Sequence, residues 1–164
     1  FFKMFGVQNN VFFELFQDGR IYSTLQYPNA LAAYLIAVFF ISIGIMVTAS
    51  KQWIRVLSAA AGYVLFITCI LTISRGVYLL APLILAIYLI SLIKGSRIKG
   101  IVYAAAPIVS AVSVALKLLG LISRPAGNEL WILIYVSIGL ALSIVLSIII
   151  DYIYEWMKNI SWPS

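Results

Sequence analysis

Long apolar runs separated by short polar segments dominate the pattern along the chain. Five of these runs approach or exceed the roughly 20 residues that an α-helix needs to cross the hydrocarbon core of a bilayer. They are Ala30–Ala49, Trp53–Ile73, Gly76–Ile93, Ile101–Ile122 and Leu130–Ile150. The pattern therefore predicts an all-α, polytopic membrane protein with about five transmembrane helices and short loops.

The turn between the second and third spans needs a separate argument, because Val56–Ile93 is apolar except at Arg75. As one helix, this stretch would be about 57 Å long, nearly twice the hydrocarbon thickness of about 30 Å. We therefore predict a turn at Ser74-Arg75-Gly76, where a charge and a flexible residue coincide. Further turns are predicted at segments rich in charge or helix breakers, namely Ser50–Gln52, Lys94–Gly100 and Ser123–Glu129.

The first 29 residues are less apolar, and we expect residues 1–29 to form an extracytoplasmic hairpin or an interfacial segment. Asp18-Gly19 suits a tight turn between two part-apolar stretches, Val11–Gln17 and Ile21–Tyr27. Alternatively, the first 16 residues form an interfacial helix or the end of an earlier span. Residues 30–164 make up the five-helix region, with Asn29 as the expected N-cap of its first helix. Because the first residue is Phe1 and not Met, we expect the chain to be a fragment of a larger membrane domain.

Composition excludes a soluble domain. Of the 164 residues 64% are apolar and only 10% are charged, against roughly 25% charged in typical soluble domains. The net charge of +6 does not indicate a nucleic-acid partner, because the basic residues stand singly beside apolar runs. The chain has no His and a single Cys, so the usual ligands of a zinc site are missing. We therefore predict no metal and no cofactor.

The distribution of Lys and Arg predicts the orientation. Six basic residues fall on one side of the predicted topology: Lys51, Arg55, Lys94, Arg97, Lys99 and Lys158. The other side has Lys3, Arg20, Arg75 and Arg124, with Lys117 near the same end of its span. The richer side is expected in the cytoplasm, which places Arg20 and Arg75 on the extracytoplasmic side.

Arg20, Arg75, Lys117 and Arg124 are thus predicted near one membrane face, and they are the candidate anion-binding residues. Arg75 is the most informative, because an arginine near hydrocarbon depth costs about 2.5 kcal/mol or more unless it reaches water or an anion. Its planar fork suits bidentate contact with phosphate. The alternative is that Arg75 and Lys117 only extend to the interface. Asp151 and Glu155 lie one helical turn apart beyond the fifth span, where we expect a solvated cytoplasmic end.

Two segments in order resemble the O-antigen ligase and polymerase superfamily: Arg20-Ile21-Tyr22-Ser23, leading to Asn29-Ala30 at the start of a span, and Ser74-Arg75-Gly76 between two later spans. The resemblance covers about residues 20–93. It implies a bacterial glycosyltransferase that ligates or polymerises undecaprenyl-diphosphate-linked glycan. It also implies that Arg20 and Arg75 hold the diphosphate of the donor. The partners would be a lipid-linked oligosaccharide donor and a glycan, lipid or protein acceptor.

The chain departs from that family in one respect. The ligase branch carries a histidine on a large extracytoplasmic loop after these helices, and this sequence contains no His. Either the chain stops short of the acceptor-activating part or this branch works without that histidine, and the first alternative is favoured. We therefore name no catalytic residue, and we expect the chain alone to be inactive. The alternatives are a fragment of a transporter or flippase, and a non-catalytic membrane scaffold. A transporter would favour interrupted helices and polar residues near the membrane midplane, which are sparse here.

Overall fold

The structure is a computed structural model that describes residues 16–17, 20–21, 28–91, 94–122 and 128–160. Its helices are α1 (Pro28–Thr48), α2 (Gln52–Leu71), α3 (Arg75–Ser91), α4 (Lys94–Ile122) and α5 (Glu129–Ile160). Within α1, α2, α4 and α5 lie four segments long and apolar enough to cross a membrane. The prediction of a helical, polytopic fold is therefore confirmed, with four candidate spans among the described residues where about five were predicted. α3 covers the third predicted span but has 17 residues, fewer than any of the other four helices.

Two helices extend further than the hydropathy pattern predicts. Lys94–Gly100 was predicted as a turn, but these residues form the first turns of α4. α5 continues past the predicted end at Ile150 as far as Ile160. The reason is that apolarity reports where a helix crosses lipid, whereas Lys, Arg, Glu and Met are good helix formers that continue a helix into water. At the other end of the chain α1 begins at Pro28, so Asn29 lies in the first turn instead of capping it.

The chain reverses between α2 and α3 slightly earlier than predicted. α2 ends at Leu71, and Arg75 is the first residue of α3. The reversal thus occupies residues 72–74, where Ile73 has a φ of 51°. A β-branched residue rarely adopts this left-handed conformation, which stores strain. Thr72 stabilises the turn, because its hydroxyl donates a hydrogen bond to the carbonyl oxygen of Cys69 over 2.7 Å.

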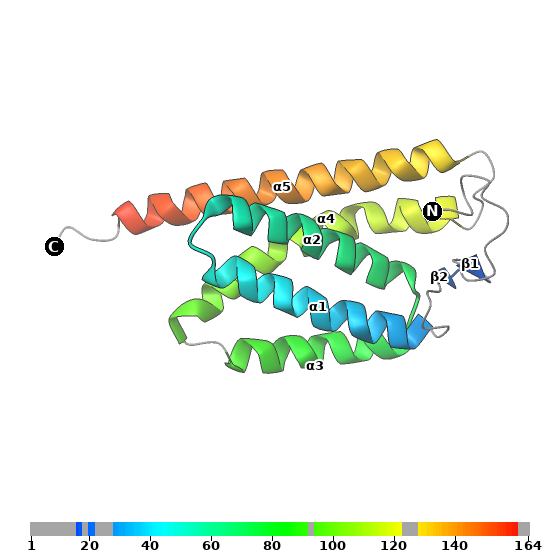
Figure 1. Cartoon of the computed structure of the whole chain (residues 1–164), viewed down its shortest axis with the longest axis horizontal. Coiled ribbons are helices and arrows are strands. Elements are labelled where there is room, and N and C mark those ends of the chain that lie inside the picture. Colours follow the sequence, from blue (N-terminus) through cyan, green and yellow to red (C-terminus); the bar gives the residue numbers. More distant parts are fainter. Residues whose placement is uncertain (1–15, 18–19, 22–27, 92–93, 123–127, 161–164) are drawn as a thin grey trace.

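A short antiparallel strand pair precedes the helices. β1 (Phe16–Gln17) pairs with β2 (Arg20–Ile21), with Phe16 opposite Ile21 and Gln17 opposite Arg20. The two strands stand on either side of Asp18-Gly19, the predicted turn, which itself lies outside the described residues. β2 contacts α2, and Figure 1 places the strand pair beside the end of the bundle where α1 begins.

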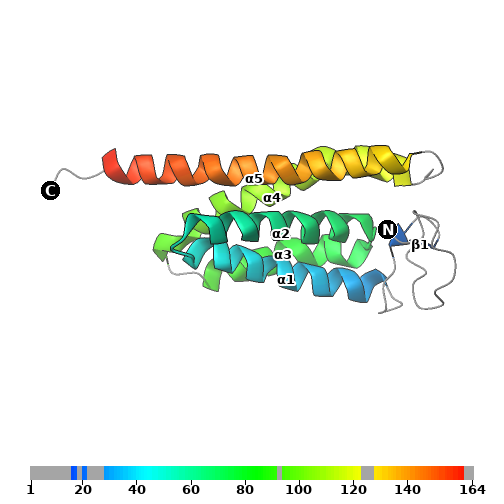
Figure 2. The ribbon, with the colours of Figure 1, turned by 45° about the horizontal axis from the view of Figure 1, so that its top comes forward.

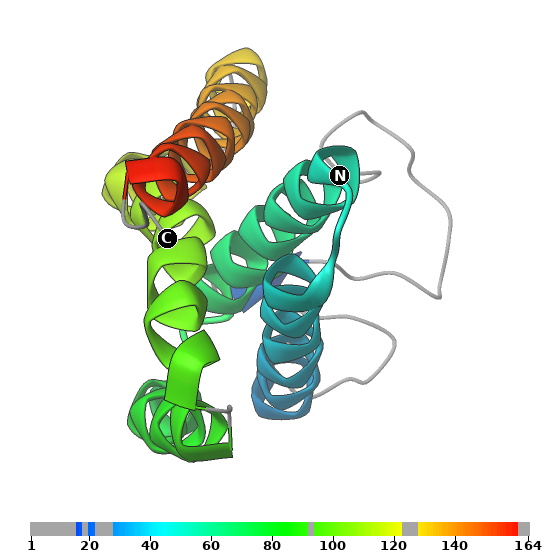
Figure 3. The same cartoon turned by 90° about the vertical axis from the view of Figure 1, so that its left-hand side faces the viewer.

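Successive helices run in alternating directions, so the bundle has two ends (Figure 1). α1, α3 and α5 begin at one end, which we call the Arg75 end, and α2 and α4 begin at the other, the Lys51 end. α4 contacts all four other helices, and α2 contacts α1, α4 and α5, so these two helices are central. α3 and α5 lie at opposite margins when the bundle is viewed along its helices (Figure 3). The last turns of α5 project beyond the other helices at the Lys51 end (Figure 2).

The buried face of α1 shows why this helix packs inside the bundle. Its buried residues come in neighbouring pairs that recur about once per helical turn: Leu31 and Ala32, Leu35 and Ile36, Phe39 and Phe40, Ser42 and Ile43, and Met46 and Val47. This spacing keeps one stripe of the helix against its neighbours. Several apolar residues between the pairs are exposed, among them Tyr34, Ile41 and Ile45, as expected where lipid covers the outer face.

α2 and α5 pack tightly against each other at Gly139. A Cβ atom built at this glycine would lie 2.2 Å from the hydroxyl oxygen of Tyr63. Tyr63 is fully buried and donates a hydrogen bond to the carbonyl oxygen of Val136 over 3.1 Å. One turn further along α5, the hydroxyl of Ser143 donates to the carbonyl oxygen of Ala59 over 3.1 Å. Small residues let the two backbones come together, as is typical of helix packing in membranes.

Candidate functional site

At the Arg75 end a side-chain hydrogen bond joins the starts of α1 and α3. The hydroxyl of Ser74 donates to Oδ1 of Asn29 over 2.9 Å, although 45 positions separate the two residues. Ser74 is buried, and the next residue, Arg75, begins α3. The contact therefore fixes the backbone that carries Arg75 against the segment that opens α1.

Three of the four predicted site residues lie within the described residues. Arg20 is in β2, and its backbone lies at the Arg75 end of the bundle beside α2. Arg75 is the first residue of α3 at the same end. Lys117 is exposed on the last turns of α4. The fourth, Arg124, lies outside the described residues. The fold thus brings the backbones of Arg20 and Arg75 to one end of the bundle.

Lys117 belongs to a different surface at that end. It lines an open groove of about 450 Å³ whose other walls include Leu116, Asn128, Trp131 and Tyr135. Leu116 and Lys117 belong to α4, Trp131 and Tyr135 belong to α5, and Asn128 immediately precedes α5. Since α3 lies at the margin opposite α5 (Figure 3), Lys117 is not grouped with Arg75.

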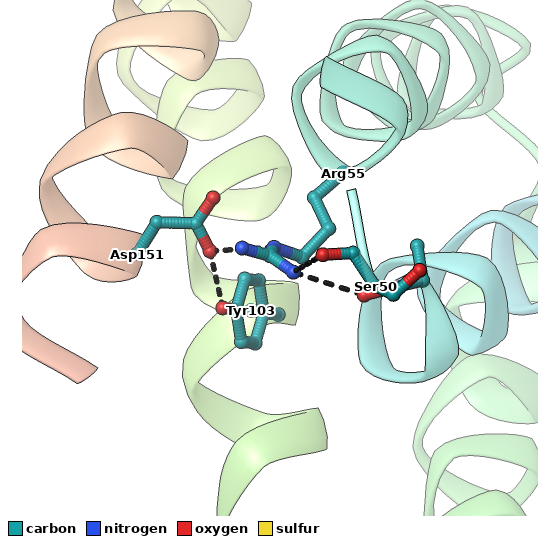
Figure 4. Close-up of polar contacts among 5 residues, drawn as sticks. Ser50, Arg55, Tyr103 and Asp151 are labelled. Atoms are coloured by element: carbon teal, nitrogen blue, oxygen red, sulfur yellow. Dashed lines mark hydrogen bonds and ion pairs between the residues drawn. The ribbon is translucent and has the colours of Figure 1, made fainter. Parts of the chain in front are cut away.

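At the Lys51 end a buried polar network joins three helices (Figure 4). Nε of Arg55 on α2 donates a hydrogen bond to Oδ1 of Asp151 on α5 over 2.8 Å, and the two side chains form an ion pair. The same carboxylate oxygen accepts a hydrogen bond from the hydroxyl of Tyr103 on α4. Nη1 of Arg55 donates to the carbonyl oxygens of Ala49 and Ser50, over 2.9 and 3.3 Å, in the segment between α1 and α2.

The network is shielded from solvent. The side chains of Arg55 and Asp151 are only 10% and 3% exposed. A buried ion pair is stable only when both charges keep good hydrogen bonds, because taking each of them out of water costs several kcal/mol. Arg55 meets this condition, because it contacts a carboxylate and two carbonyl oxygens. Asp151 meets it in part: Oδ1 accepts two hydrogen bonds, whereas the buried Oδ2 has no hydrogen-bond partner among the described residues. The ion pair connects α2 to α5 directly, and the hydrogen bond from Tyr103 connects α4 to the same carboxylate. The network therefore links three helices at this end.

A second cation lies beside the network. Nζ of Lys99 is 5.7 Å from the ring centroid of Tyr103 and 5.3 Å from that of Tyr154. Both distances are within the range of a cation–π interaction. Lys99 therefore stacks over the aromatic rings next to the ion pair.

The ion pair was missed by the sequence analysis, which predicted that Asp151 and Glu155 form a solvated end. That prediction is wrong for Asp151, which is buried, and it holds for Glu155, which is exposed. A local signal was present in the spacing Ser143, Ser147, Asp151, because residues four apart occupy one helical face. All three are buried.

The fold defines a class of protein, namely a multi-pass helical membrane protein. No protein-family model, curated protein or solved structure matches the chain. Within the described ranges, no three His, Cys, Asp or Glu side chains gather as a metal site would require.

Proposed function

We propose that the chain is the membrane portion of a bacterial glycosyltransferase that ligates or polymerises undecaprenyl-diphosphate-linked glycan. Arg20 and Arg75 would bind the diphosphate of the donor at the extracytoplasmic face of the inner membrane. Lys117 and Arg124 would contribute positive charge at the same face without contacting the donor as closely. The acceptor would be a glycan, a lipid or a protein.

The observation that supports this proposal most is the hydrogen bond between Ser74 and Asn29. These residues belong to the two segments on which the family resemblance rests. Asn29 lies in the first turn of α1 and Ser74 immediately precedes α3, and these two helices are not consecutive in the chain. A site made of both segments requires them to be adjacent. Arg20 lies in β2, close before Asn29 in the chain, and β2 contacts α2.

The position of Arg75 is also favourable for an anion. It is the first residue of a 17-residue helix that has no acidic residue in its first turn. Backbone N–H groups at a helix N-terminus attract phosphate, and the helix dipole adds to that attraction. A guanidinium at the same place can contact two phosphate oxygens at once. As the sugar leaves, negative charge grows on the diphosphate, and fixed positive groups in a water-poor site stabilise that transition state.

The proposal requires α3 to cross the membrane as a fifth span. Its 17 residues correspond to about 25 Å, and helices of 17 to 25 residues cross bilayers. In a Cys69→Ala background, single cysteines introduced as Arg75→Cys and Arg97→Cys should react with a membrane-impermeant thiol reagent from opposite sides. The position-75 cysteine should react from the periplasmic side. Reaction of both cysteines from one side would contradict a crossing by α3.

The function is tested by glycan transfer from an undecaprenyl-diphosphate-linked donor, using the full-length protein in membranes. Arg75→Ala and Arg20→Ala should each abolish transfer while the amount of protein in the membrane stays unchanged. Arg75→Lys should restore little activity, because one ammonium group cannot reproduce a bidentate contact. Arg124→Ala should have a smaller effect, because that residue is expected in a wetter loop where its charge is screened.

Arg97→Ala provides the matched control. It removes the same side chain at the Lys51 end of the bundle, where Nη2 of Arg97 donates to the carbonyl oxygen of Ile90 over 3.0 Å. Transfer should survive this change. Normal transfer by Arg75→Ala would reject the proposed site and favour a transporter or a scaffold.

A further inference from the structure

A shallow apolar groove lies between α2 and α5 at the Lys51 end. Its volume is about 550 Å³, and its walls include Trp53, Leu57 and Ala60 of α2 and Ile144 and Ile148 of α5. Trp53 and Leu57 are strongly exposed, so the groove opens away from the helix bundle. A volume between about 300 and 1,000 Å³ is typical of sites that hold small molecules.

The length and position of the groove match one leaflet of a membrane. From Gln52 at the start of α2 to Ala60, the helix rises about 12 Å. One leaflet contributes about half of the roughly 30 Å hydrocarbon core. Trp53 lies at the outer end of the groove, and exposed tryptophans settle at the level of the lipid headgroups. The apolar walls of the groove between Trp53 and Ala60 therefore lie at the depth of lipid acyl chains.

Positive charge marks the outer end of the groove. Lys51 immediately precedes Gln52, is exposed, and makes no side-chain capping hydrogen bond as the N-cap of α2. The first turn of α2 contains no acidic residue, and its open N–H groups add to the attraction for an anion. The buried carboxylate of Asp151 does not oppose this attraction, because Arg55 neutralises it.

We propose that this groove binds one anionic phospholipid of the adjoining leaflet. The phosphate would lie at Lys51 and the first turn of α2, and an acyl chain would occupy the groove from Trp53 to Ala60. Neither the apolar walls nor the basic residue alone would select such a ligand. Together they match a molecule with a negative head and an apolar tail. This site is independent of the diphosphate site, which lies at the opposite end of the bundle.

Quenching of Trp53 fluorescence by brominated acyl chains tests the proposal on the full chain in vesicles. Trp131, Trp156 and Trp162 are replaced by phenylalanine, so that Trp53 is the only reporter. Brominated phosphatidylglycerol should quench Trp53 with an apparent affinity about fivefold higher than brominated phosphatidylcholine at equal mole fraction, as expected for one lysine near an anionic lipid, worth about 1 kcal/mol. Equal quenching by the two lipids would overturn the proposal.

Two variants separate the headgroup from the tail. Lys51→Gln should remove the preference for phosphatidylglycerol, and a preserved preference would reject the role of Lys51. Ala60→Phe should weaken quenching by both lipids because it fills the groove, and unchanged quenching would reject the acyl-chain site. A chain that keeps Trp156 as its only tryptophan is the matched control. That residue is exposed on α5 outside the groove, so it should be quenched equally by both lipids.

Discussion

Replacement of Asp151 by asparagine is expected to lower the free energy of unfolding by about 3 kcal/mol. Removing one partner of a buried ion pair typically costs about 3–5 kcal/mol, because the remaining charge stays buried without compensation. Here that charge is the guanidinium of Arg55, which is 10% exposed and would keep only neutral acceptors, namely the carbonyl oxygens of Ala49 and Ser50 and the amide oxygen of the new asparagine. Asparagine still offers an acceptor to Tyr103, which places the effect at the lower end of the range. Thermal or denaturant unfolding in detergent measures it.

Two variants identify the cause of this loss. Glu155→Gln removes a carboxylate charge one turn further along α5, where the side chain is exposed, and it should leave stability within about 0.5 kcal/mol of the original. Arg55→Met added to Asp151→Asn should recover much of the lost stability, because the buried charge is then gone. If Asp151→Asn proved as stable as Glu155→Gln, the ion pair would not hold α2 against α5.

Gly139→Ala is expected to destabilise the bundle by about 2 kcal/mol. In an exposed helix, alanine would be favoured over glycine by up to about 1 kcal/mol. At this position, however, the new Cβ would lie 2.2 Å from the hydroxyl oxygen and 2.6 Å from Cζ of Tyr63. Atoms in contact prefer about 3.5–4.0 Å, so the ring or α5 must shift by more than 1 Å. Tyr63 is fully buried, and forcing extra volume into a packed core typically costs about 1–3 kcal/mol.

Gly120→Ala on α4 is the matched control, because a Cβ atom there would meet nothing within 4 Å. Its stability should be unchanged or increased. Tyr63→Phe combined with Gly139→Ala should recover only part of the loss, since Cζ remains too close. Equal unfolding temperatures for Gly139→Ala and Gly120→Ala would contradict the close approach of α2 and α5.

The sequence by itself determined the class of fold. Bilayer thickness is nearly constant, so the length of an apolar run was enough to identify the candidate spans in α1, α2, α4 and α5. The charge at Arg75 was enough to divide Val56–Ile93 into two helices. Both inferences need only residues that are neighbours in the chain. The start of α4 at Lys94 and the end of α5 at Ile160 were not predicted, because the hydropathy pattern ends at the lipid boundary while each helix continues beyond it.

Only the tertiary structure decided which helix faces meet. Asp151 pairs with Arg55 across 96 positions, and Ser74 meets Asn29 across 45. In a soluble protein the apolar stripe of a helix would reveal its inner face. In a membrane, lipid is as apolar as the interior of the bundle, so α1 is apolar on its buried and its exposed faces alike. The rotation of each helix about its axis, and with it the partner of every buried polar side chain, is set by the packing of the assembled bundle.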